Sequence, residues 1–146
     1  MIDASDFWQL MRVVHLLGAV VWVGGMFFAI LIMRPSLASL DPSRRVDIYR
    51  AVFSRFFRMI LVVMPGMLVT GYLMVYGEFG GFADAPWNVH LMHMLGLAMS
   101  AIFLATWFGP YRAFRNGQGR AIEIIRRMVV ANLVLGLVTL VVALLH

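Results

Sequence analysis

The chain of 146 residues has the length of a single domain, but its composition excludes an ordinary water-soluble one. Hydrophobic residues make up 62% of the chain and charged residues 13%, against about 45–50% and about 25% in soluble domains. A chain this short has too little interior to bury that excess, so the composition indicates an integral membrane protein. Its net charge of +5 is read as a membrane topology signal, and we expect no nucleic-acid partner.

The sequence contains no cysteine and no lysine, so all twelve basic residues are arginine. The lack of cysteine excludes disulfides, thiolate catalysis and thiolate metal sites. The lack of lysine excludes Schiff-base chemistry. Histidine and methionine remain as the side chains for ligand chemistry.

Four apolar stretches are each long enough to cross a hydrocarbon core of about 30 Å. They lie near residues 7–33, 59–76, 87–109 and 128–145. They are too long and too uniformly apolar for barrel strands, because backbone groups in lipid must be satisfied within helices or a closed barrel. The sequence therefore predicts an all-α fold, a four-helix transmembrane bundle that forms one domain over residues 1–146.

The arginines are distributed unevenly between the connections. The connection between the first two spans carries six, the connection between the last two carries five, and the middle one carries none. By the positive-inside rule the first and third connections are cytoplasmic. Both termini and the middle loop are then on the periplasmic side of a bacterial inner membrane.

The first connection is also expected to hold an interfacial helix that starts at Asp41 and Pro42. The side chains predicted to face lipid from this helix are Val46, Tyr49, Val52, Phe53, Phe56 and Phe57.

The two halves of the chain resemble each other. The sequence His-Leu-Leu-Gly at 15–18 matches His-Met-Leu-Gly at 93–96, and Leu-Val-Thr occurs at both 68–70 and 137–139. The match predicts two parallel helical-hairpin repeats, related by an axis along the membrane normal. Such repeats would place His15 and His93 at one depth, on opposite sides of that axis.

His15 and His93 are ionisable residues deep within predicted spans, which makes them functional hypotheses. At about 100° per residue, each shares a helix face with polar, aromatic or small residues. The predicted cofactor-binding set is His15, His93, Arg12, His90, Gly18, Trp22 and Gly96. His146 is expected to mark only the water interface.

Three ligand hypotheses fit these residues. The first is haem b, with His15 and His93 as axial ligands of the iron and Arg12 near the propionates. The second is copper, held by imidazole and thioether groups; its ligands would be His90, Met92, His93 and Met94. In the third, the histidines make structural contacts and bind nothing.

Haem would make the chain a redox protein for electron transfer, or an oxidoreductase acting on a membrane-soluble quinol or porphyrin. Copper would make it a transport or resistance protein. Without a ligand it would be a structural subunit of a respiratory complex. In each case the lipid bilayer is a partner, and a redox partner or a homo-oligomer is a further expectation.

One pattern in the first span resembles the CopD-like bacterial membrane proteins. The residues that carry it are His15, Trp22, Gly24, Gly25, Phe27, Phe28, Arg34 and Pro35, followed by the arginine-rich connection. Trp87, His90 and His93 at the start of the third span support it. This resemblance covers nearly the whole chain and implies copper uptake or tolerance.

The four-helix plan is also similar to the HemJ-type protoporphyrinogen IX oxidases of the same broad superfamily, which are associated with haem b. That resemblance implies a histidine in the first span, matched by His15, with a nearby tryptophan and glycine at Trp22 and Gly25. It also implies a lysine early in the third span, where this chain has His90 and His93 instead.

Overall fold

The computed structural model describes residues 3–145, and all regular secondary structure in that part of the chain is helical, without a strand. The elements in order are α1 (Ala4–Phe28), the π-helical turn η1 (Ala29–Met33), α2 (Arg34–Ser36), α3 (Pro42–Phe79), the 3₁₀ turn η2 (Phe82–Asp84), α4 (Trp87–Phe108), α5 (Pro110–Arg115) and α6 (Ala121–Ala143). Within the described residues, four helical segments are long and apolar enough to cross a membrane. The predicted all-α, four-helix transmembrane architecture is confirmed.

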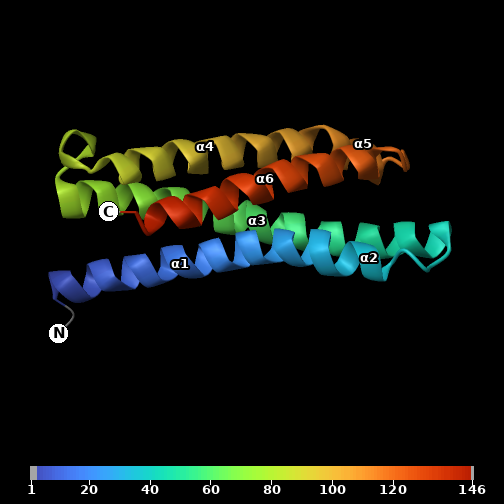
Figure 1. Cartoon of the computed structure of the whole chain (residues 1–146), viewed down its shortest axis with the longest axis horizontal. Coiled ribbons are helices and arrows are strands. Elements are labelled where there is room, and N and C mark those ends of the chain that lie inside the picture. The colour runs from blue at the N-terminus through green and yellow to red at the C-terminus, as the bar shows by residue number, and fades with distance from the viewer. Residues whose placement is uncertain (1–2, 146) are drawn as a thin grey trace.

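The long helices lie along one common axis (Figure 1). The α2–α3 and α5–α6 connections meet at one end, here called the arginine-rich end. The α3–α4 connection lies at the opposite end together with the start of α1, and we call this the terminal end. Packing is most extensive between α1 and α3 and between α4 and α6. The bundle therefore consists of a first hairpin (α1 and α3) docked against a second hairpin (α4 and α6).

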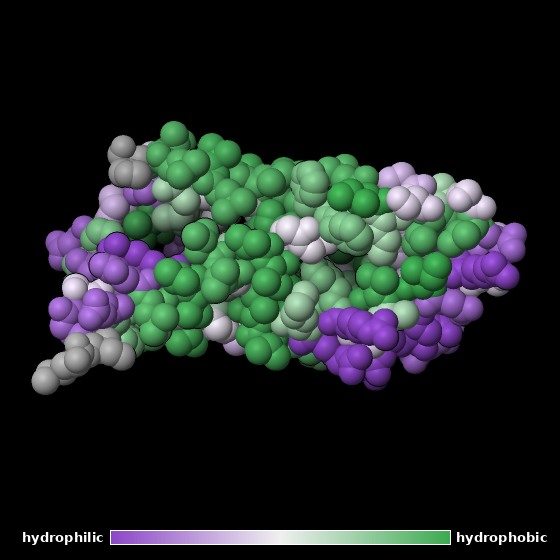
Figure 2. All heavy atoms as spheres, turned by 90° about the horizontal axis from the view of Figure 1, so that it is seen from below, coloured by the Kyte–Doolittle hydropathy of each residue, from purple (hydrophilic) through white to green (hydrophobic). Residues whose placement is uncertain are grey.

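The hydropathy of the surface varies along the same axis. Figure 2 shows a broad hydrophobic band around the middle of the molecule, with hydrophilic residues gathered at the two ends. This is the distribution expected of a bundle whose middle lies in hydrocarbon and whose ends lie in the interfacial regions.

The helix ends are set by local sequence. The Asp3 side chain caps α1 by accepting a hydrogen bond from the backbone N–H of Asp6. The Asp6 side chain in turn accepts one from the backbone N–H of Asp3. Hydrogen bonds from the Ser5 hydroxyl and then from the Asp6 backbone lower the pKa of the Asp3 carboxyl. Gly80, with φ of 74°, ends α3 in the left-handed conformation that glycine adopts without a steric penalty.

The end of α1 is widened into a π-helical turn. The N–H of Arg34 donates to the carbonyl of Ala29, five residues earlier, and Pro35 follows immediately. Proline has no N–H, and its ring collides with the carbonyl four residues before it in a regular α-helix. The wider turn accommodates Pro35 and lets the helix continue to Ser36. Single π turns of this kind are frequent at functional sites.

The separate interfacial helix predicted after Asp41 is the first part of α3, which runs unbroken from Pro42 to Phe79. The prediction that its aromatic side chains face lipid is wrong for Tyr49, Phe53 and Phe57, which are all buried. Phe57 packs against Tyr111 of α5, with ring centroids 4.6 Å apart. Phe53 and Phe57 find aromatic partners on α4 and α5, whereas Tyr49 packs against Phe53 of its own helix. Such pairs add about 0.5–1.5 kcal/mol each.

The two halves of the bundle are packed differently. The largest fully buried side chains, all toward the arginine-rich end, are Phe57, Phe114, Met26, Ile60 and Ile125. Toward the terminal end the hairpins separate around a cavity. The dense half fixes the helices relative to one another, and the hollow half leaves space for a ligand.

Candidate functional site

A cavity of about 840 Å³ lies in the terminal half, and all four long helices line it. Its volume is within the range of about 300–1,000 Å³ typical of small-molecule and cofactor sites. The walls are mainly apolar. Polar side chains interrupt them at Arg12, His15, Glu78, Asn88, His93, Ser100 and Thr139. An apolar cavity with a few polar groups is the arrangement expected of a specific binding site.

His15 enters this cavity from α1 and is oriented by Thr70 of α3. The distance between His15 Nδ1 and Thr70 Oγ1 is 2.8 Å. The Thr70 hydroxyl donates its single proton to the backbone carbonyl of Gly66, at 2.8 Å. With its proton on Gly66 the hydroxyl accepts from Nδ1–H of His15, and in this tautomer the lone pair of the neutral imidazole is on Nε2. A histidine fixed in this way is prepared to act as a metal ligand.

His93 enters from α4 between two aromatic rings of the same end of the bundle. Its ring centroid lies 4.3 Å from that of Tyr72 and 4.9 Å from that of Phe82. Its Nε2 is buried and has no hydrogen-bond partner, and the same holds for Oδ1 of Asn88 on the cavity wall. Buried polar atoms are normally satisfied, so two orphaned atoms beside one cavity point to a missing ligand or water.

Arg12 and Glu78 form an ion pair on the outer rim of the cavity, with Nε and Oε1 2.8 Å apart. Arg12 is 62% exposed, whereas Glu78 is 19% exposed. The pair joins α1 to the end of α3 and places one charge of each sign at the rim. The guanidinium therefore already has a carboxylate partner.

Methionine thioethers also line the cavity, in addition to its polar side chains. Five methionines line it, namely Met64, Met67, Met74, Met92 and Met99. Within residues 3–145 no cluster of three or more histidine, aspartate or glutamate side chains is arranged to hold a metal ion. The possible metal ligands that line the cavity are two imidazoles and five thioethers, a soft set that suits copper(I).

The structure places the predicted site residues in two groups. Arg12, His15, Trp22, Met92, His93 and Gly96 all line the cavity, whereas Gly18, His90 and Met94 do not. Gly18 instead receives Met67, whose Cγ would lie 2.7 Å from a Cβ added at that glycine. His90 and Met94 are exposed. His146 is outside the described residues.

Several residues of the site were not singled out in the sequence. These are Thr70 and Glu78 on α3 and Asn88 and Met99 on α4. For Thr70 a signal existed, because it belongs to the repeated Leu-Val-Thr sequence, and its counterpart Thr139 also lines the cavity. Threonine in a helix commonly bonds its own backbone, so the sequence alone did not assign it to His15.

Comparison with protein families gives one match. The family model described as CopD, Copper resistance protein D, matches residues 50–145, about two thirds of the chain. This confirms the resemblance to CopD-like membrane proteins indicated by the sequence. Comparison with curated proteins gave no match, and neither did comparison with solved structures.

Proposed function

Because the chain belongs to the CopD family, we propose that it is a multi-pass membrane protein that binds copper(I) as cargo in the cavity between its two hairpins. The family description names copper resistance. The observation that carries the proposal is the meeting of His15 and His93 with five methionines around one cavity. Haem, the first hypothesis from the sequence, gains no support from the family match.

The donor chemistry favours copper(I) over other metals. Thioether and imidazole groups are preferred ligands of copper(I), while magnesium and calcium take oxygen ligands. Methionine is also common core filler in membrane helices. What distinguishes these five side chains from filler is that they line the same cavity as His15 and His93, and that Nε2 of His93 is buried without a partner.

The proposed copper site differs from the ligand set expected from the sequence. That set combined His90, Met92, His93 and Met94, which are consecutive or nearly so. The side chains of neighbouring residues on a helix diverge by about 100°. Only Met92 and His93 of the set line the cavity, so we assign the other donors to His15 on α1 and to methionines of α3 and α4.

The test is copper(I) binding by the purified full chain, measured by competition with a chromophoric copper(I) chelator. We expect His15→Ala and His93→Ala each to weaken copper(I) affinity by at least about tenfold, which is a loss of about 1.4 kcal/mol or more. We expect Met67→Leu, which keeps the shape and removes the sulfur, to weaken it as well.

Matched controls come from the residues that lie outside the cavity. His90→Ala and Met94→Leu should leave copper(I) affinity unchanged, because both side chains are exposed away from it. An equal loss of copper(I) affinity in the control variants and in the cavity variants would contradict the assignment of the copper ligands to the cavity. Stoichiometric copper that survives both His15→Ala and His93→Ala would contradict it too.

Haem b is the second candidate, and the cavity volume is the observation that favours it. A volume of about 840 Å³ is larger than a single ion requires and lies within the range for cofactors. His15 and His93 would then supply axial imidazoles, and the haem would supply one-electron redox chemistry. An absorption spectrum of protein from haem-replete cells separates the candidates, because only a haem protein shows a Soret band.

A further inference from the structure

A second pocket, of about 290 Å³, lies on the arginine-rich side of the candidate cavity and is lined by a separate set of residues. Its walls come from α1, the π turn, α3 and α6. Three arginines line it, namely Arg34, Arg45 and Arg126, together with the single carboxylate of Glu123. The pocket therefore carries a net positive charge.

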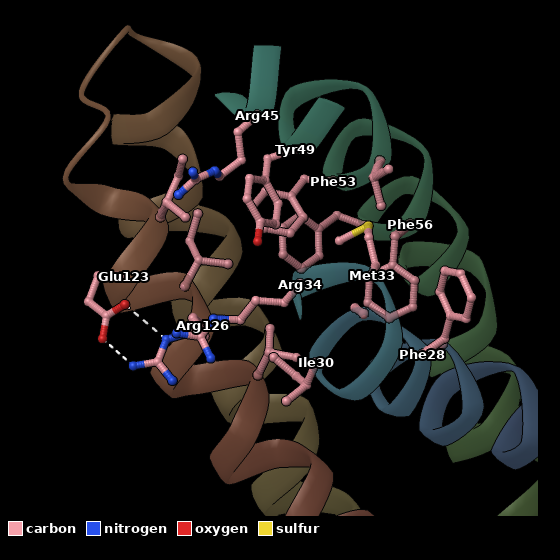
Figure 3. A pocket seen from close by; sticks show the side chains of 17 residues that line it. Phe28, Ile30, Met33, Arg34, Arg45, Tyr49, Phe53, Phe56, Glu123 and Arg126 are labelled. Atoms are coloured by element: carbon pink, nitrogen blue, oxygen red, sulfur yellow. Dashed lines mark hydrogen bonds and ion pairs between the residues drawn. The ribbon is translucent and has the colours of Figure 1, made fainter. Parts of the chain in front are cut away.

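The charges on this pocket are incompletely compensated. Glu123 pairs with Arg126 through both oxygens, with Nε and Oε2 2.8 Å apart. Among the described residues Arg34 makes no ion pair, and Nε of Arg45 is buried without a partner. Figure 3 shows the side chains of Arg34 and Arg126 extending toward one another. Two neighbouring guanidinium groups repel each other unless an anion lies between them.

The rest of the pocket is apolar and continues away from the arginines. Phe28 and Ile30 lie on α1 and the π turn, and Phe56 lies opposite them on α3 (Figure 3). Phe28 is six residues before Arg34, about 9 Å deeper along the helix axis. It is 53% exposed on the side of the bundle that faces lipid. An anionic site is thus joined to an apolar surface that leads into the hydrocarbon.

We propose that this pocket binds an anionic phospholipid, with its phosphate between Arg34 and Arg126 and its acyl chain against Phe28, Ile30 and Phe56. Arginine binds phosphate through charge-assisted and frequently bidentate hydrogen bonds. Basic pockets between transmembrane helices bind anionic head groups for the same reason. The orphaned Nε of Arg45 adds a further donor at the rear of the pocket.

The test measures which lipid stays bound to the purified full chain, by native mass spectrometry from mixed micelles. The probes are phosphatidylglycerol and phosphatidylcholine with identical acyl chains. We expect retention of phosphatidylglycerol to exceed that of phosphatidylcholine about tenfold, and Arg34→Gln to remove most of this preference. Arg44→Gln is the matched control, because Arg44 is exposed at the same end and does not line the pocket.

A second variant tests the charge balance without removing an arginine. Glu123→Gln frees Arg126 from its carboxylate partner and should raise phosphatidylglycerol retention severalfold. This prediction holds even if Arg34→Gln proves unstable by circular dichroism. An unchanged or lower retention in Glu123→Gln would overturn the proposal.

Two further outcomes would also overturn it. Equal retention of the two lipids would show that the arginines do not select an anionic head group. Displacement of phosphatidylglycerol by an equal concentration of inorganic phosphate would show a free-anion site without a role for the acyl chain. The measurement uses no copper, so it is independent of the proposed function.

Discussion

The hydroxyl of Thr70 determines which nitrogen of His15 is free to bind a ligand. In the tautomer in which Nδ1 of His15 carries the proton, this hydroxyl accepts from Nδ1 and donates to the carbonyl of Gly66, and Nε2 keeps the lone pair. Partners that orient a metal-binding histidine typically change metal affinity 10- to 100-fold when removed. A residue that touches no ligand therefore controls the proposed copper site.

We expect Thr70→Val to weaken copper(I) affinity about 10- to 100-fold by removing the hydroxyl that orients His15. Valine has nearly the shape of threonine, so the packing of α3 changes little. Thr106→Val is the control, because the Thr106 hydroxyl bonds the carbonyl of Ile102 and Thr106 does not line the cavity. The measurement is chelator competition, with circular dichroism to verify folding. Equal effects of the two variants would contradict the role of Thr70.

The two deep histidines were predictable from the sequence, because ionisable residues within apolar spans are costly and therefore conspicuous. Their environments were not. The repeat implies equivalent positions for His15 and His93, yet His15 is bonded to Thr70 while His93 lies between Tyr72 and Phe82. The difference arises because Phe82 comes from the α3–α4 connection, which has no counterpart in the repeat.

The helices themselves were predictable from hydropathy, but the faces that they bury were not. The predicted span 87–109 nearly coincides with α4, whereas the predicted span 128–145 begins seven residues after α6 begins at Ala121 and ends two residues beyond Ala143. In α3, however, polar and apolar residues alternate at the start, a pattern typical of both an interfacial helix and a buried one. The start of α3 is buried because aromatic side chains of α4 and α5 pack against it. Those side chains are remote in sequence, so the local pattern does not reveal them.

Two glycines of the second hairpin, one on α4 and one on α6, serve different purposes. A Cβ added at Gly136 would lie 2.8 Å from Cγ2 of Val23, so Gly136 allows α1 and α6 to approach closely. A Cβ added at Gly96 would meet nothing within 4 Å, and Gly96 lines the candidate cavity. Gly96 therefore contributes volume to the cavity, and Gly136 contributes to helix packing.

We expect Gly96→Leu to reduce ligand binding while leaving the fold intact. Leucine would occupy part of the cavity, and replacing an interior helical glycine favours the helix by up to about 1 kcal/mol. Gly24→Leu is the control, since Gly24 is equally unobstructed and does not line the cavity. Copper(I) affinity and thermal stability should be measured for both. Unchanged affinity in Gly96→Leu would argue against a ligand in this cavity.

For the whole molecule, the distribution of arginine predicts the orientation in the membrane. The structure gathers eleven of the twelve arginines on the α1–α3 and α4–α6 connections and the adjoining helix ends. We propose that this end is cytoplasmic and that the terminal end is periplasmic, as the positive-inside rule requires.

The absence of cysteine makes this orientation directly measurable. Single cysteines would be introduced as Ser5→Cys and Ala83→Cys at the terminal end and Gln118→Cys at the arginine-rich end. We expect a membrane-impermeant maleimide to label the first two on intact spheroplasts, and the third only after lysis. The reverse pattern would contradict the proposed topology.

The division into two hairpins has a thermodynamic consequence for the candidate cavity. The strongest helix contacts lie within each hairpin, whereas the cavity walls come from both. The cavity therefore exists only when the hairpins are docked, and whatever binds there adds its binding free energy to their association. At a ligand concentration 100 times the dissociation constant, this contribution is about 2.7 kcal/mol. The unliganded protein is then weakest along the seam between the hairpins, while each helix keeps its own backbone hydrogen bonds.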